Sequence, residues 1–169
     1  MRKKFFLSII LSCCLSICYS QSLTCYSLEE ALENKDSVAT LILKKKKLKE
    51  FPMEILDLKN LQRLDISRNY IKELPKEIVS LQHLHYINAA QNLLSFLPKE
   101  MAQMQIDTLI LWDNMIREFD EDFKNLNLKY LDLRAIQMTR KEQKAIKSLF
   151  PKTRIRKDHP CNCGSRKEN

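Results

Sequence analysis

The stretch Leu64-Asp65-Ile66-Ser67-Arg68-Asn69-Tyr70-Ile71 opens a pattern that returns about every 23 residues along the chain. In this copy the pattern continues with Leu74-Pro75, Ile78, Leu81 and Leu84. The copy before it contains Leu41, Leu43, Leu48, Phe51-Pro52, Ile55, Leu58 and Leu61. The copy after it contains Ile87, Ala89, Asn92, Leu94, Leu97-Pro98, Met101 and Met104. A fourth copy contains Leu109, Leu111, Asn114, Ile116, Phe119, Phe123 and Leu126, and a fifth begins at Leu131 and Leu133.

Each copy places its apolar side chains where one coil of chain can bury them. Leu64 and Ile66 are separated by one residue, so both point to the same face of a short strand. That face is the inside of the coil, and the later apolar residues line the rest of the interior. Because one copy buries its apolar side only against its neighbours, stacking of the copies gives one continuous core.

An asparagine follows the strand in three copies, as Asn69, Asn92 and Asn114. A buried amide at this point needs hydrogen-bond partners, and the backbone of the turn and of the adjacent coil can supply them. We therefore predict a structural role for these asparagines. On the returning side, a proline fixes the backbone where no ladder donor is needed. The prolines of the three copies are Pro52, Pro75 and Pro98.

The pattern L-x-x-L-x-L-x-x-N-x-L-x-x-L-P-x-x-I-x-x-L resembles the leucine-rich repeat in its typical form of about 23 residues, over residues 38–138. The resemblance implies an α/β solenoid, a horseshoe with a short curved parallel sheet of about five strands. Its convex side is expected to be irregular or short-helical. Lys46 and Ile136 replace the asparagine in the first and fifth copies, and Asp120 replaces the proline in the fourth. Such departures are typical of the ends of a repeat array.

Helical caps are expected at both ends of the repeats. Ser27-Leu28-Glu29-Glu30 and Thr139-Arg140-Lys141-Glu142 both have capping-box spacing, which predicts helices over residues 27–33 and 140–149. The N-terminal segment and its cap then occupy residues 21–37, and the C-terminal cap occupies residues 139–156. Within this cap, residues 153–156 are expected to add a short final strand or an extended segment. Residues 157–169 are polar and basic, which predicts a disordered tail.

The first 20 residues read as a signal peptide. Arg2, Lys3 and Lys4 precede a largely apolar segment over residues 5–17, and small residues allow cleavage after Ser20. An alternative is a lipobox ending at Cys13, whose cysteine would carry a lipid. No later segment is long and apolar enough to cross a membrane. The chain is therefore predicted to be exported, as a secreted or periplasmic protein of bacterial type, with a lipid-anchored envelope protein as the alternative.

Composition excludes several kinds of site. The chain has a single glycine, Gly164, whereas phosphate-binding loops and nucleophile elbows need several. The net charge is +8, but the basic residues gather toward the C-terminal end, which argues against a nucleic-acid-binding domain. The histidines are His83, His85 and His159, and none lies in a catalytic motif. We predict that the protein is not an enzyme and binds no cofactor.

The sequence does not determine how the cysteines pair. Cleavage after Ser20 would keep an odd number of cysteines, namely Cys25, Cys161 and Cys163. Cys25 lies before the repeats and the other two lie beyond them, so a disulfide between the ends would require the tail to fold back. Cys161 and Cys163 with His159 offer two thiolates and one imidazole, whereas tetrahedral zinc sites use four ligands, and no metal site is predicted.

Residues between and beside the core leucines of each strand point outward from the concave sheet. The repeat register stacks them in three columns: Thr40, Arg63, Tyr86, Thr108 and Tyr130; Ile42, Asp65, Asn88, Ile110 and Asp132; Lys44, Ser67, Ala90, Trp112 and Arg134. Aromatic residues and an isoleucine gather in the C-terminal half of this face, with polar residues around them, which is typical of a binding surface. We predict a partner-binding face composed of Tyr86, Asn88, Ile110, Trp112, Tyr130, Asp132 and Arg134.

The predicted function is an exported interaction module that binds a protein or peptide on this concave face. The alternative is a lipid-anchored or glycan-binding protein of the cell envelope. The basic run Lys44-Lys45-Lys46-Lys47 is most simply a solvated edge, although it also suits an acidic partner, an anionic glycan or a membrane surface. The sequence names neither the partner nor the oligomeric state.

Overall fold

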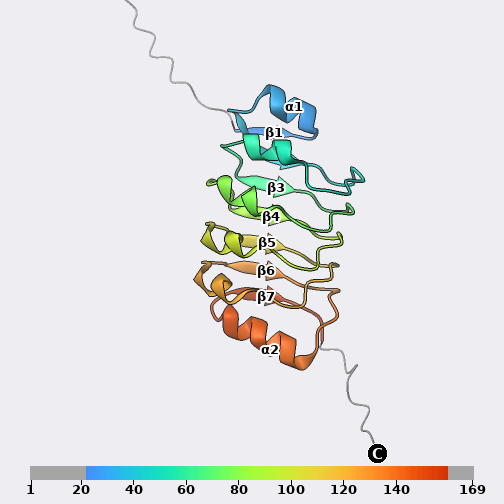
Figure 1. Ribbon diagram of the computed structural model, residues 1–169, viewed down its shortest axis with the longest axis vertical. Helices are drawn as coiled ribbons and strands as arrows, with labels where there is room; N and C mark the ends of the chain where they lie inside the picture. Colours follow the sequence, from blue (N-terminus) through green and yellow to red (C-terminus); the bar gives the residue numbers. More distant parts are fainter. Residues whose placement is uncertain (1–21, 160–169) are drawn as a thin grey trace, which may run out of the picture.

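The computed structural model describes residues 22–159, which form a single parallel sheet wound into a solenoid. Figure 1 shows the strands stacked in chain order along the long axis of the molecule. The seven strands are β1 (Leu23–Cys25), β2 (Val38–Ile42), β3 (Arg63–Asp65), β4 (Tyr86–Asn88), β5 (Thr108–Ile110), β6 (Tyr130–Asp132) and β7 (Arg154–Arg156). The solenoid class is therefore confirmed.

A short 3₁₀ helix returns the chain in each of the first four repeats. These helices are η1 (Met53–Asp57), η2 (Lys76–Ser80), η3 (Lys99–Gln103) and η4 (Glu121–Asn125). A proline immediately precedes each of the first three, and Asp120 takes that position before η4. The Asp120 side chain accepts a hydrogen bond from the backbone N–H of Asp122, so the carboxylate starts η4 where proline starts the other turns.

Two α-helices close the ends of the stack, as Figure 1 shows. In α1 (Leu28–Glu33) the Ser27 hydroxyl accepts a hydrogen bond from the backbone N–H of Glu30. In α2 (Arg140–Leu149) Thr139 and Glu142 form a complete capping box. The ring of Phe150, just after α2, packs edge-on against Phe119 at a centroid distance of 5.4 Å.

The expected number of about five strands is too low, because the sheet continues into both caps. β1 pairs in parallel with β2, and its register shifts between Leu23 and Thr24. This strand precedes the repeats and is too short to show a period in the sequence. As a result, Cys25 is fully buried in the stack. At the other end, β7 pairs with β6 and provides the last strand of the sheet.

The core runs without a break through the stack. Each repeat strand has a fully buried residue at the same register position, and neighbouring strands pair these residues directly. They are Leu41, Leu64, Ile87, Leu109 and Leu131. Because this residue points inward, the residues on either side of it point to the concave face. The positions of the buried residues therefore determine which side chains are presented on the concave face.

Buried asparagines join successive coils. The Asn92 amide nitrogen donates to the carbonyl of Ile66 in the preceding coil (3.0 Å) and to that of Ala89 in its own coil (3.1 Å). Its oxygen accepts from the backbone N–H of Ile71, also in the preceding coil (3.0 Å). Asn69 and Asn114 make equivalent bonds. One side chain thus satisfies buried backbone groups of two coils at once.

The residue before each asparagine position has a left-handed backbone conformation. Arg68, Gln91 and Asp113 have φ between 55° and 59°, and Lys45 and Ala135 occupy the same place in the first and fifth copies. These turns contain no glycine, so the surrounding hydrogen bonds must hold the strained conformation. The N–H of Arg68, for example, donates to the carbonyl of Ala90 in the next coil at 2.8 Å.

In the last coil, a side chain rather than a backbone carbonyl accepts the hydrogen bond from this turn. Gln91 and Asp113 donate their N–H to Trp112 and Arg134 of the following coils, whereas Ala135 donates to the carboxylate of Asp158 at 2.6 Å. Asp158 therefore takes the place of the carbonyl that a further coil would supply. This bond fixes the end of β7 against the last repeat.

Replacing Asn92 with alanine is expected to lower the free energy of unfolding by roughly 2–4 kcal/mol, because buried backbone groups of two coils lose their partners. Urea denaturation at neutral pH measures the change. Asn127→Ala, at an exposed position, is the matched control and is expected to change stability by about 0.5 kcal/mol or less. An equal, small effect of both substitutions would contradict the structural role of the buried amide.

Candidate binding face

The concave face of the sheet brings the predicted site residues into register. Tyr86, Thr108 and Tyr130 lie on successive strands, and so do Asn88, Ile110 and Asp132. Adjacent strands are about 4.8 Å apart, so residues in one column are near neighbours. β7 extends these columns, because Arg154 pairs with Tyr130 and Arg156 pairs with Asp132.

The apolar centre of this face is partly covered by its own neighbours. Tyr86, Ile110, Trp112 and Tyr130 are all half-buried. The guanidinium carbon of Arg63 lies 3.8 Å from the centre of the Tyr86 ring, in a cation–π contact. Burial raises the pKa of the Tyr86 hydroxyl, and the positive charge of Arg63 offsets part of that rise. Tyr86 therefore presents a neutral phenol in a fixed orientation.

Asp132 is buried beneath the face, although it was expected among the polar residues around the aromatic group. Its side chain is 3% exposed, and Arg134 binds it with two guanidinium nitrogens, the shortest distance being 2.7 Å. The Tyr130 hydroxyl donates to the same carboxylate at 3.3 Å. Burial alone would raise the pKa of Asp132, but the hydrogen bonds from Arg134 hold it below its ordinary value. Asp132 thus anchors Tyr130 and Arg134 from below.

Other polar side chains of this face are also used within the chain. Asp65 and Asn88 each accept a hydrogen bond from the backbone N–H two residues later, on Ser67 and Ala90. Asn88 also donates from its amide to the second oxygen of Asp65 at 3.0 Å. These side chains close the strand-end turns, which leaves the aromatic residues and the arginines as the groups best able to meet a partner.

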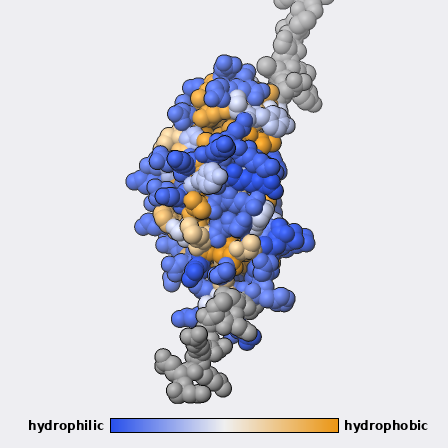
Figure 2. Space-filling model, turned by 90° about the vertical axis from the view of Figure 1, so that its right-hand side faces the viewer, coloured by the Kyte–Doolittle hydropathy of each residue, from blue (hydrophilic) through white to orange (hydrophobic). Residues whose placement is uncertain are grey.

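A second surface lies on the turns after the strands, and from the sequence only the basic run Lys44–Lys47 at its N-terminal end was considered. We call it the strand-end edge, and it comprises residues 45–50, 68–73, 91–96 and 113–118. Tyr70, Leu93 and Met115 are exposed there, each directly after an asparagine of the repeat. Figure 2 looks onto the side where the strands end and shows hydrophobic surface interrupting a mostly hydrophilic face. In the sequence, this surface could have been recognised from the apolar residue that directly follows each asparagine.

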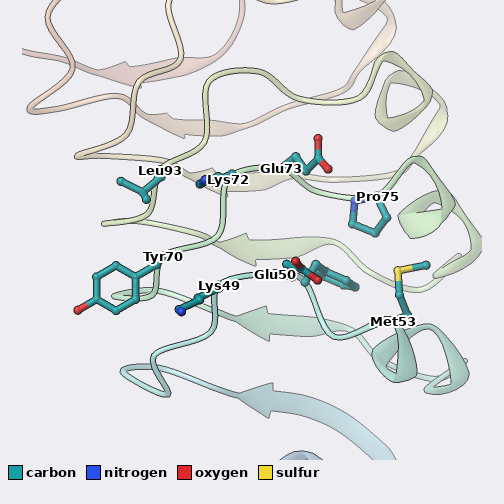
Figure 3. Close-up of a pocket in the computed structure, with 9 residues that line it drawn as sticks. Lys49, Glu50, Met53, Tyr70, Lys72, Glu73, Pro75 and Leu93 are labelled. Atoms are coloured by element: carbon teal, nitrogen blue, oxygen red, sulfur yellow. The ribbon is translucent and has the colours of Figure 1, made fainter.

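A hollow of about 780 Å³ opens beside Tyr70 on this edge, as Figure 3 shows. Its lining is mixed, with charged side chains from two coils between the exposed tips and the 3₁₀ helices. The lining residues are Lys49, Glu50, Phe51, Met53, Tyr70, Lys72, Glu73, Pro75 and Leu93.

Among residues 22–159, no group of three or more His, Cys, Asp or Glu side chains is placed to hold a metal ion. Burial raises the pKa of the Cys25 thiol, with a further contribution from Glu30, so this cysteine is a weak nucleophile. Cys161 and Cys163 lie outside the described residues, as do Cys13 and Ser20. Within that same part of the chain, no helix has the length and apolar character needed to span a bilayer.

Replacing Asp132 with asparagine tests its anchoring role through pH. The folded pKa of Asp132 is lowered, so its contribution to stability is present above about pH 4, the unfolded value, and is lost as the pH falls through the folded value. We expect the wild-type advantage over Asp132→Asn to be largest near pH 7 and to shrink at pH 3 in urea denaturation. Asp36→Asn, on an exposed side chain, is the control. An advantage of Asp132 that stays constant with pH would contradict the ion pair.

Comparison with known proteins identifies relatives of this scaffold. A leucine-rich-repeat protein of Leptospira interrogans has a TM-score of 0.70 and 32% identity, over 79% of this chain and 34% of that one. An internalin (InlF) of Listeria monocytogenes has a TM-score of 0.61 and 16% identity, over 79% of this chain and 40% of that one. The plant peptide hormone receptor RGFR1, in complex with RGF2, has a TM-score of 0.58 and 20% identity, over 80% of this chain and 23% of that one.

These relatives are all longer than this chain, which spans from 23% to 40% of their lengths. No curated protein matches the sequence. The family model described as a leucine-rich repeat region matches residues 15–157, which is most of the chain. The protein therefore belongs to the leucine-rich repeat family.

Proposed function

We propose that this protein is an exported module that binds a protein or peptide on its concave face. The observation that supports the proposal is that the half-buried Tyr86, Ile110 and Tyr130 lie on adjacent strands, with the half-buried Trp112 two residues beyond the end of β5. Tyrosine, tryptophan and arginine are the residue types that most often dominate binding energy. A rigid sheet holds them in place before a partner arrives, which lowers the entropy cost of binding.

The family supports this proposal in general terms. Leucine-rich repeats typically serve as scaffolds for protein interaction rather than catalysis, and a plant receptor with this fold is seen in complex with RGF2. The fold alone does not identify a partner, so the side chains of the concave face support this role. A partner that covers Trp112 would remove apolar surface from water, while Arg134, held by Asp132, offers charged donors at a fixed position.

A photo-crosslinking residue at position 110 tests the face directly in cells that make the protein. We expect one discrete protein or peptide adduct from position 110 and none from position 76, which lies on η2 at the convex side. Adding Trp112→Ala should weaken binding roughly 10- to 30-fold and reduce the adduct accordingly. Equal adducts from both positions, or an adduct that survives Trp112→Ala unchanged, would reject the concave face as the binding surface.

Export has its own test, which is mass spectrometry of the mature N-terminus. Cleavage after Ser20 should give a chain that begins at Gln21, because the leader has a basic start and a short apolar segment. A chain that begins at an acylated Cys13 would instead support the lipid-anchored alternative. An intact Met1 in the mature protein would contradict export through this leader.

A further inference from the structure

The exposed apolar side chains of the strand-end edge form a row. Tyr70, Leu93 and Met115 occupy the same position in three successive coils and are 54%, 38% and 55% exposed. Their backbone N–H groups donate to carbonyls of the preceding coil at 2.7, 2.9 and 2.8 Å, so the turns that hold them are tied down. A fixed row of apolar tips on a charged surface is a feature that the concave face does not account for.

Cations surround the N-terminal end of this row. All of them are exposed, and none forms an ion pair among residues 22–159. They are Lys44, Lys45, Lys46, Lys47, Lys49, Arg68 and Lys72. Tyr70 lies between two hollows, one lined by Lys45 and Arg68 and the other by Lys49 and Lys72. Positive charge therefore reaches both sides of the most N-terminal apolar tip.

The side chains of this edge are layered by polarity. Figure 3 shows Tyr70 and Leu93 outermost, at the tips of the turns, with Lys49 and Lys72 next and Glu50 and Glu73 farther back. Surface-bound amphipathic segments show the same order, since their apolar groups enter the lipid boundary while lysines reach the phosphates. Glu50 and Glu73 lie behind the lysines, away from the tips, whereas the exposed Asp113 lies in the turn before Met115, at the C-terminal end of the row.

We propose that the strand-end edge docks onto an anionic lipid bilayer. A flat target can contact the three apolar tips together, because they lie in one row along the stack. Tyrosine is suited to the water–lipid boundary, and each nearby cation is attracted by negative headgroups. A soluble acidic polymer would use the cations but would leave Leu93 and Met115 without a role. The concave face lies on another side of the coils and stays free for its partner.

Vesicle co-sedimentation tests this proposal with the chain from Gln21 onward, which keeps every described residue. The probe is vesicles of phosphatidylcholine with about one third phosphatidylglycerol, compared with pure phosphatidylcholine at low and high salt. We expect binding to the anionic vesicles alone, weakening as salt screens the charges. Lys45→Glu with Arg68→Glu should reduce partitioning roughly tenfold or more.

The apolar tips and a matched control complete the test. Leu93→Ser with Met115→Ser should also weaken binding several-fold at constant charge, because less apolar surface enters the lipid. Lys76→Glu with Lys99→Glu makes the same charge change on the convex helices η2 and η3 and should bind nearly as well as wild type. Retained circular dichroism would show that each variant is folded.

Three results would overturn the proposal. One is absence of binding to the anionic vesicles, and another is binding that the serine variant leaves unchanged. The third is tight retention on immobilised heparin, a soluble acidic polymer, together with no vesicle binding, which would assign the cations to a glycan. None of these results depends on the concave face, so the proposed function is tested separately.

Discussion

The amide of a buried asparagine is the interaction on which the rest of this structure depends. In Asn92 it satisfies the N–H of Ile71 and the carbonyls of Ile66 and Ala89, which belong to two coils. These bonds hold a left-handed turn at the residue before the asparagine, where no glycine is present to relieve strain. They also fix the spacing between coils. The concave face and the strand-end edge are both columns of residues, and a column exists because this spacing repeats.

The sequence predicted the parts of the fold that repeat. Leu64 and Ile66 indicated the strand and its buried face, and the capping-box spacing at Thr139 indicated α2. The strand β1 has no repeat pattern of its own and forms because β2 offers a free edge, so its sequence gave no signal. The strand count therefore came out too low.

The sequence pattern also failed to predict side-chain burial where tertiary contacts determine it. Asp132 belongs to an outward-facing column, yet Tyr130 and Arg134 cover it and bind its carboxylate. A period of two assigns a residue to a face of the sheet but does not report what its neighbours place over it. The same limit applies to Tyr70, whose exposure depends on the shape of the turn rather than on hydropathy.

The concave face and the strand-end edge are suited to two different proposed roles. The concave face presents aromatic side chains anchored from below, and the strand-end edge presents apolar tips backed by cations. A docked edge would leave the sheet open to a partner and would bring that partner near the bilayer. Both roles require that the coils behave as one rigid body, since separate movement of the coils would break the columns.

Hydrogen exchange of individual amides tests that rigidity most directly. The N–H groups of Leu48, Ile71 and Leu94 are the ones bonded to the asparagine side chains. If the asparagines join the coils into one unit, these three amides exchange as slowly as the strand amide of Ile87, through global unfolding. Exchange of these amides at the rate of exposed turn amides, while Ile87 stays protected, would contradict the account.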